Sequence, residues 1–127
     1  MDEKRVTELS IIANRVRKHA LTAVYSAASG HPGGSLSVAD ILTLLYFEVM
    51  NIDPKNPRME DRDRFVLSKG HTAPALYGTL AERGYFPVED IPTFRHIGSY
   101  LQGHPDMNKV PGVDMSTGSL GQGVSAA

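Results

Sequence analysis

The chain has 127 residues, of which 41% are hydrophobic and 21% charged, and its formal net charge at pH 7 is −1. This balance gives no electrostatic reason to expect a nucleic-acid partner, and the absence of cysteine excludes disulfides, thiolate chemistry and cysteine-ligated zinc. The charged N-terminus lacks the apolar stretch of a signal peptide, and no segment approaches the run of about 20 apolar residues that spans a membrane. We therefore expect a cytoplasmic protein with no membrane partner, forming one domain or part of one.

The first part of the chain is expected to be helical. Apolar residues recur at steps of three and four between residues 3 and 28, which predicts one amphipathic helix ended by Gly30. A second helix is expected to begin at Ser37, because Ser37 and Asp40 have the Ser-x-x-acid spacing of an N-terminal cap. Its apolar residues continue to Val49.

The second part of the chain alternates short elements with loops. Residues 65–68 (FVLS) are an apolar run with β-forming residues, which predicts one buried strand. Helices are expected at 74–83, closed by Gly84, and at 88–94, whereas residues 98–118 are rich in loop-forming residues. A parallel sheet needs several strands. A mostly helical stretch with one predicted strand therefore indicates the opening part of an α/β domain, so that we expect a truncated chain.

Four glycine-rich stretches are the most informative feature of the sequence, and the first three each carry one histidine. They are residues 29–34 (SGHPGG), 69–71 (KGH), 103–105 (GHP) and 117–123 (TGSLGQG). Helix interiors disfavour Gly and Pro, so each stretch is expected in a loop or at the end of an element. Imidazole titrates near neutrality and each ring nitrogen can donate or accept, so three such turns together indicate a functional site.

Common ligand-binding motifs do not account for these stretches. The three histidines are far apart in sequence and lack the spacing of zinc ligands, and no Walker loop occurs. Residues 118–123 are a poor dinucleotide fingerprint because no clear strand precedes them. They do form a flexible turn leading into a helix N-terminus, which favours an anionic group such as a diphosphate.

Taken together with residues 63–71 and 111–114 (PGVD), the four stretches resemble the N-terminal part of transketolase, a thiamine diphosphate enzyme. The resemblance covers residues 9–127 and implies an α/β thiamine diphosphate-binding fold, a parallel sheet flanked by helices. Residues 1–127 would then be an incomplete N-terminal portion of the diphosphate-binding domain. The implied reaction moves a two-carbon ketol unit from a ketose phosphate to an aldose phosphate, in the pentose phosphate pathway.

The resemblance also implies roles for individual histidines. His31 and His104 match catalytic residues: His31 matches a histidine that contacts substrate hydroxyls, and His104 one near the reacting end of the donor sugar. His71 matches the histidine that contacts the diphosphate side of the cofactor. His19, on the first helix, is expected to be structural or exposed, and His96 receives no role.

The remaining implications concern the cofactors and the partner. Gly118, Ser119 and Leu120 match cofactor-binding positions, and Ser119, usually proline in the long-chain form, resembles the split form in which two polypeptides share the work. Thiamine diphosphate and Mg²⁺ are the implied cofactors, with the metal ligands expected beyond Ala127. A C-terminal subunit or domain would supply the glutamate that contacts the cofactor's pyrimidine, in a dimer or heterotetramer acting on sugar phosphates.

Two alternatives remain open. The chain could belong to another member of the superfamily, such as a deoxyxylulose phosphate synthase or a dihydroxyacetone synthase, although residues 69–77 and 103–105 favour transketolase over the first. It could also be a catalytically inert assembly piece that buries its apolar surface against a partner. We expect residues 1–127 alone to be inactive.

Overall fold

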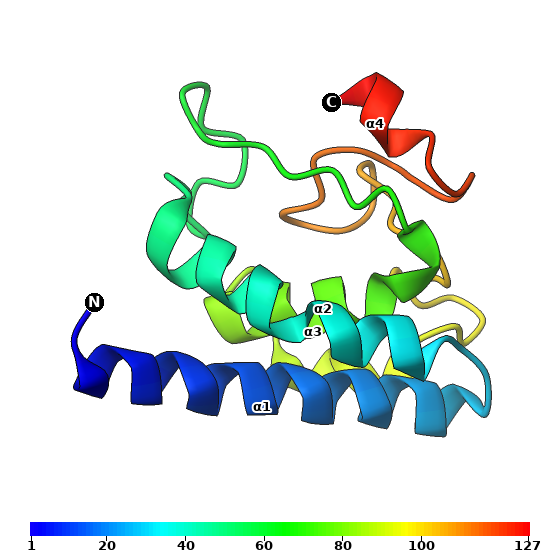
Figure 1. Cartoon of the computed structure of the whole chain (residues 1–127). Coiled ribbons are helices and arrows are strands. Elements are labelled where there is room, and N and C mark those ends of the chain that lie inside the picture. The colour runs from blue at the N-terminus through cyan, green and yellow to red at the C-terminus, as the bar shows by residue number, and fades with distance from the viewer.

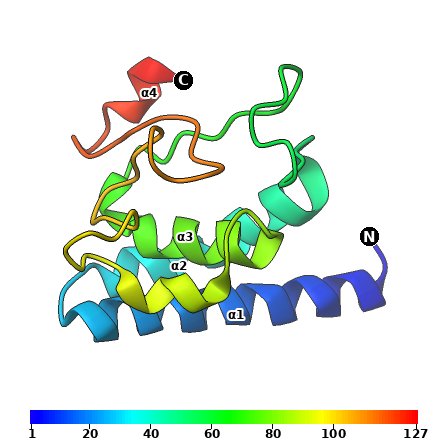
Figure 2. The same ribbon diagram turned by 180° about the vertical axis from the view of Figure 1, so that it is seen from behind.

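The computed structural model describes all 127 residues, and its helices form a layer with irregular segments along one side (Figure 1). The elements are α1 (Glu3–Ala27), α2 (Pro32–Leu44), the π-helix η1 (Leu45–Val49), the 3₁₀ helix η2 (Gly70–Thr72), α3 (Ala73–Arg83), the 3₁₀ helix η3 (Val88–Thr93) and α4 (Gly123–Ala126). None of these helices combines the length and apolarity needed to cross a membrane. In Figure 2, α4 lies on the opposite side of the helical layer from α1.

Helix α1 confirms the first predicted helix. The Asp2 side chain accepts a hydrogen bond from the Arg5 backbone N–H at 2.8 Å and so caps the first turn. Its buried residues follow one stripe, but Ala28, in a left-handed conformation with φ of 48°, ends the helix, so the predicted end at Gly30 was wrong by two residues. The buried residues of the stripe are Leu9, Ala13, Val16, Ala20 and Ala23.

Helix α2 begins earlier than predicted. It starts at Pro32, with His31 as the N-cap, so the expected start at Ser37 was wrong. Proline suits the first helical position because its φ is already helical and its missing N–H is not needed there. The Ser37 hydroxyl instead donates to the Gly34 carbonyl at 3.0 Å, inside the helix. The helix then continues into η1, which buries Tyr46.

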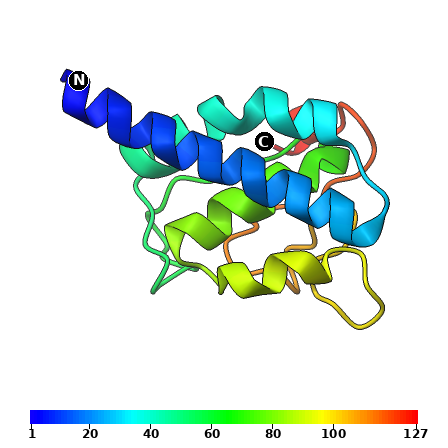
Figure 3. The ribbon, with the colours of Figure 1, turned by 90° about the horizontal axis from the view of Figure 1, so that it is seen from below.

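Helix α3 is the centre of the fold, and every residue from 73 to 81 is buried. Seen from below, α1 lies across α2 and α3, with η3 alongside (Figure 3). Helices α1 and α3 approach closely at Gly78, where an added Cβ would lie 3.0 Å from the His19 Cβ. His19 Nε2 also lies 2.6 Å from Glu82 Oε1, so this pair joins the same two helices. As predicted, α3 ends at Gly84, whose φ is 101°.

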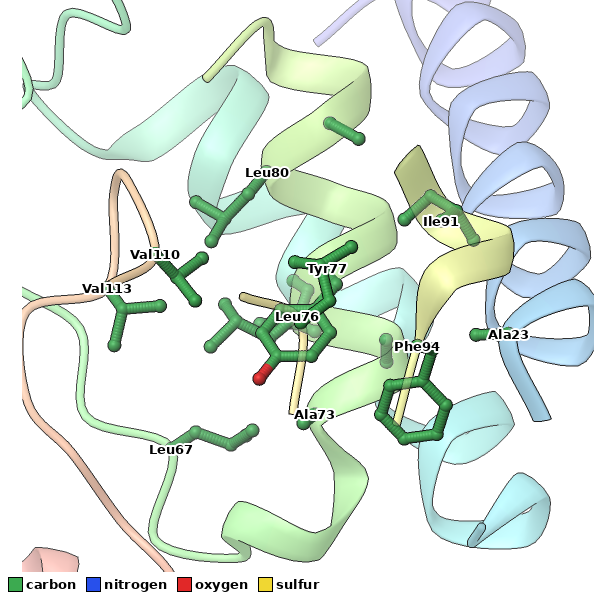
Figure 4. Packing of buried hydrophobic residues seen from close by; sticks show 14 of the residues in the cluster. Ala23, Leu67, Ala73, Leu76, Tyr77, Leu80, Ile91, Phe94, Val110 and Val113 are labelled. Carbon is green, nitrogen blue, oxygen red and sulfur yellow. The ribbon is translucent and has the colours of Figure 1, made fainter. Parts of the chain in front are cut away.

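The hydrophobic core connects α3 to the irregular segments (Figure 4). Leu76, Tyr77 and Leu80 lie on the side of α3 that faces Leu67 and the 110–113 loop. This packing holds Leu67 and the 110–113 loop against α3.

The predicted strand at residues 65–68 was wrong, because the structure contains no β-strand. The segment is extended and Leu67 is buried as expected, but no other segment forms a ladder of hydrogen bonds with it. The Phe65 N–H donates to the Asp114 carboxylate at 2.9 Å, and the Ser68 carbonyl accepts from the Gly121 N–H at 3.1 Å. Residues 65–68 therefore pack between loops and α3 rather than in a sheet.

Candidate functional site

The second and fourth glycine-rich stretches pack against each other without intervening side chains. Gly70 is buried, and a Cβ added there would lie 2.7 Å from Thr117 Oγ1 and 2.9 Å from the Gly118 backbone nitrogen. A Cβ on Gly123 would lie 2.7 Å from the Ser68 Cα. All three distances are shorter than ordinary van der Waals contact, so glycine at these two positions allows the backbones to approach this closely.

The first glycine-rich stretch joins the second through a lysine and two histidines. Lys69 Nζ donates to the Gly34 carbonyl at 2.9 Å and lies 3.3 Å from the Ser37 hydroxyl. The rings of His31 and His71 meet edge to face, with centroids 4.8 Å apart. The start of α2 and helix η2 therefore present their imidazoles to each other.

The third stretch completes the cluster. The His104 ring packs on Gly118, where an added Cβ would lie 3.5 Å from the ring's Cδ2. From α3, the Tyr77 hydroxyl donates to the Gln102 carbonyl at 2.7 Å and lies 3.1 Å from the His104 carbonyl. The structure thus brings together the three histidines that the sequence analysis singled out, on loops anchored by the central helix.

The electrostatics of His71 reflect this clustering. Its partial burial lowers its pKa because the charged imidazolium is poorly solvated, and positive charge on His31, Lys69 and His104 lowers it further. A neutral imidazole at neutral pH can accept at one ring nitrogen and donate at the other. No group of three or more His, Asp or Glu side chains gathers in the chain as a metal site requires.

The turn before α4 lies beside His104 and is open to solvent. Gly118 and Ser119 are exposed and line a shallow pocket with Thr117, Gln122, Gly123 and neighbouring residues. Leu120 does not line this pocket, and its side chain is 70% exposed. Of the three predicted cofactor-binding positions, two therefore face one concave surface while the Leu120 side chain lies outside it.

Two buried hydroxyls at this junction were not predicted from the sequence. Ser68 Oγ and Thr117 Oγ1 are buried and have no hydrogen-bond partner, whereas buried polar groups in proteins are nearly always paired. Each lies beside one of the close-approach glycines, Gly123 and Gly70 respectively. The only sequence signal for them is their proximity to glycine-rich stretches. Three further unpaired hydroxyls lie among the helices, on Ser35, Thr43 and Tyr46.

The other two histidines lie outside the cluster. His19 is half-buried and contacts Glu82, which confirms a structural position on α1. His96 is exposed and its Nε2 lies 3.4 Å from the Ser26 carbonyl.

Residues 9–127 match the family model described as transketolase, thiamine diphosphate binding domain. This match identifies the helical layer with its three histidines on glycine-rich loops as a transketolase N-terminal domain. The chain belongs to the transketolase family.

A curated relative and two solved structures agree with this assignment. The chain is 50% identical over its full length to a 6-deoxy-6-sulfo-D-fructose transketolase subunit from Clostridium sp. (strain MSTE9), and it covers 46% of that protein. The structure matches transketolase from Leishmania mexicana with a TM-score of 0.88 and 39% identity, over 92% of this chain and 18% of that one. It matches the Pichia stipitis transketolase complex with sedoheptulose 7-phosphate with a TM-score of 0.85 and 43% identity, over 91% of this chain and 17% of that one.

The chain matches only part of the length of each of these relatives. The chain spans less than half of the curated subunit and less than a fifth of the two solved transketolase chains. These relatives are all named as transketolases, which does not favour the deoxyxylulose phosphate synthase alternative.

Proposed function

We propose that this chain supplies the diphosphate-binding portion of a transketolase that transfers a two-carbon ketol unit from a ketose phosphate to an aldose phosphate. One observation carries the proposal: His31, His71 and His104 come from three separate stretches, the rings of His31 and His71 are in contact, and the His104 ring packs on Gly118. The pentose phosphate pathway is the metabolic setting that this reaction implies.

The junction of the glycine-rich stretches fits the diphosphate of thiamine diphosphate. Ser68 and Thr117 hold buried hydroxyls without partners there, and Gly118 and Ser119 of the adjoining turn are exposed to solvent. Hydroxyl and backbone N–H donors suit phosphate oxygens. When bound, thiamine diphosphate supplies the carbon nucleophile and electron sink for ketol transfer.

The three histidines would then contact different polar groups of the cofactor and the substrate. His71, held neutral by its surroundings, would donate to the diphosphate side of the cofactor. His31 and His104 are exposed to solvent, so their ring nitrogens are free to contact substrate hydroxyls. A neutral imidazole can move a proton between two hydroxyls near neutral pH, which is the role that we assign to these two residues.

The complete active site requires groups from outside this chain. The ligands of Mg²⁺ and the glutamate that contacts the pyrimidine ring belong, in our proposal, to further sequence and to a companion subunit or domain. The relative from Clostridium is itself named as a subunit, which supports a split enzyme assembled as a dimer or heterotetramer. The isolated chain is accordingly expected to be inactive.

The assembled enzyme tests the proposal directly. With its companion polypeptide, thiamine diphosphate and Mg²⁺, we expect xylulose 5-phosphate and ribose 5-phosphate to yield sedoheptulose 7-phosphate. His104→Gln should lower kcat/KM about 100-fold or more, in the range for loss of an acid–base group, whereas the control His96→Gln should retain wild-type activity. Absence of ketol transfer with every donor tested would refute the proposed reaction.

The donor sugar is a separate question within the same reaction. Because the Clostridium relative is named for 6-deoxy-6-sulfo-D-fructose, we include this sulfo-sugar as a second donor. Comparing kcat/KM for the two donors with one acceptor shows which anionic end group the assembled enzyme prefers. A higher value for the sulfo-sugar would move the proposed pathway away from pentose phosphates while leaving ketol transfer intact.

A further inference from the structure

Arg95 has an unusual backbone and an unusual environment. Its φ of 63° lies in the left-handed region, which L side chains other than Asn and Asp rarely adopt. Its backbone N–H donates to the Leu101 carbonyl at 2.8 Å, so the conformation turns the chain back on itself just before the third glycine-rich stretch. Such strained residues persist where the surrounding contacts hold them in place.

The guanidinium of Arg95 lies between two of the site loops. Its NH1 donates to the Ser29 hydroxyl, at the start of the first glycine-rich stretch. On its other side is Gly103, where an added Cβ would lie 2.8 Å from Nε. Its Cζ also lies 5.4 Å from the centroid of the buried Phe94 ring, within the range of a cation–π contact.

No carboxylate accounts for this placement. Arg5, Arg17 and Arg62 each pair with an acidic side chain, whereas Arg95 forms no ion pair. Its contacts are instead a hydroxyl two residues before His31 and the glycine directly before His104. The planar guanidinium therefore fills the space between the two loops that carry these histidines.

We propose that Arg95 is a positioning residue that fixes the loop of His31 relative to the loop of His104. Tyr77 holds the His104 loop from α3, and Arg95 joins that loop to the start of α2. The distance between the two loops matters for catalysis only if the proposed function holds, because His31 and His104 would then contact one substrate. Gly103 is part of the same arrangement of contacts, because a side chain there would displace the guanidinium of Arg95.

Nuclear magnetic resonance of the purified chain tests the coupling without any assay of activity. With five histidines in 127 residues, each imidazole can be followed separately. Arg95→Met keeps the length of the side chain and removes its donors. We expect it to shift the side-chain resonances of His31 and His104 together, and to raise amide exchange at residues 29–34 and 101–105 about tenfold, as local opening does.

Two further variants separate positioning from general stability. Arg17→Met, which removes a surface pair between Arg17 of α1 and Asp40 of α2, should leave His31 and His104 unchanged. In Ser29→Ala the acceptor is lost, so the double variant with Arg95→Met should be no more perturbed at His31 than Arg95→Met alone. Movement of only one loop, equal shifts of all five histidines, or strictly additive effects would each overturn the proposal.

Failure of the proposed role of Arg95 and failure of the proposed reaction give different results. Coupled shifts of His31 and His104 in a chain whose assembled enzyme transfers no ketol unit would retain the structural role of Arg95 and reject the reaction. Ketol transfer by the assembled enzyme, with no coupled shift of His31 and His104, would retain the reaction and reject the positioning role of Arg95.

Discussion

The imidazole rings of His31 and His71 lie edge to face, with centroids 4.8 Å apart and planes inclined by 70°. His31 occupies the N-cap position of α2 and His71 belongs to η2, so the contact joins the first and second glycine-rich stretches. Two imidazolium ions at this distance repel each other. The pair therefore favours states in which at least one ring is neutral.

The first prediction concerns the pKa of His71. Partial burial, and then the charges of His31, Lys69 and His104, hold this pKa below the ordinary value of 6.5. In His31→Asn one of these charges is lost, so the pKa of His71 should rise toward its ordinary value. A titration of the His71 side-chain resonances measures it, and Lys18→Ala, an exposed change on α1, should leave it unchanged.

The same shift has a consequence for stability. Below pH 6.5 the unfolded chain binds a proton at His71 more readily than the folded chain does, so this residue lowers the free energy of unfolding as pH falls from 6.5 through the folded pKa. The contribution is absent at higher pH, where His71 is neutral in both states. Urea unfolding of His71→Gln should therefore show a shallower acid loss than the wild type. An equal loss in both proteins contradicts the shift.

The second prediction concerns the close approach at Gly70. An added Cβ would meet the Thr117 carbonyl carbon at 2.8 Å and the Gly118 nitrogen at 2.9 Å, and backbone atoms cannot move aside as a flexible side chain can. We expect Gly70→Ala to lower the free energy of unfolding by about 1–3 kcal/mol, the usual cost of overpacking. Chemical denaturation measures the change.

Gly33 supplies the matched control for this variant. A Cβ at Gly33 meets nothing within 4 Å, and the residue lies in the first turn of α2. Gly33→Ala should therefore gain about 0.4–1 kcal/mol, because alanine restricts the unfolded chain. Equal stability of the two alanine variants would show that the junction adapts to a side chain.

The sequence carried different amounts of information about different elements. The apolar stripe through Val16 is enough to predict α1, because one face of a helix must be buried. The Ser37–Asp40 spacing also fits a cap, yet α2 begins at Pro32, because proline at the first helical position already has a helical φ and has no N–H that needs an acceptor. The apolar run around Leu67 correctly predicted its burial, but such a run does not identify a partner strand, and the structure contains no strand that pairs with it.

The site was predictable in composition and not in its internal contacts. Histidines on glycine-rich turns indicated a site, and the family resemblance gave His31, His71 and His104 their expected roles. The unpaired hydroxyls of Ser68 and Thr117 could not be predicted, because their burial depends on how closely two distant backbones approach. For the same reason, no local pattern places Arg95 between two loops.

The third prediction concerns Tyr46, which is 2% exposed and whose hydroxyl has no partner. Tyr46→Phe keeps the edge-to-face contact with Phe65 and removes a buried, unpaired hydroxyl. We expect the free energy of unfolding at neutral pH to rise by about 1 kcal/mol, the lower end of the desolvation penalty. Urea unfolding measures this, and Tyr25→Phe is the control because Tyr25 is 87% exposed.

Alkaline pH gives a second measurement on the same variant. Burial, with the charge of Asp114 and then Tyr85 in support, raises the pKa of Tyr46 above its ordinary value of 10.0. The folded chain thus holds this proton more tightly than the unfolded chain, and stability falls as pH rises above 10. Tyr46→Phe should lose less stability than the wild type over this range. A variant that is less stable at neutral pH would indicate that the hydroxyl has a partner.

The last prediction concerns Asp114, which holds the segment leading to the site. Its Oδ1 accepts from Arg62 Nε at 3.0 Å and NH2 at 2.8 Å, and its Oδ2 accepts from the Phe65 N–H at 2.9 Å. The side chains of Arg62 and Asp114 are only 16% and 9% exposed. Asp114→Ala leaves a guanidinium and an N–H without their acceptor, so we expect a loss of about 3 kcal/mol.

Two comparisons make this prediction specific to the buried pair. Lys109→Ala removes a pair with Asp106 at 3.8 Å in which the lysine is 61% exposed, and should cost at most about 1 kcal/mol. Arg62→Met combined with Asp114→Ala should recover part of the loss, because the unpaired buried charge is gone. Since residues 65–71 follow directly from this anchor, Asp114→Ala should also increase amide exchange at Gly70 and His71, whereas Lys109→Ala should not. If both single variants cost the same, the segment that carries His71 is held by its packing on α3 and not by Asp114.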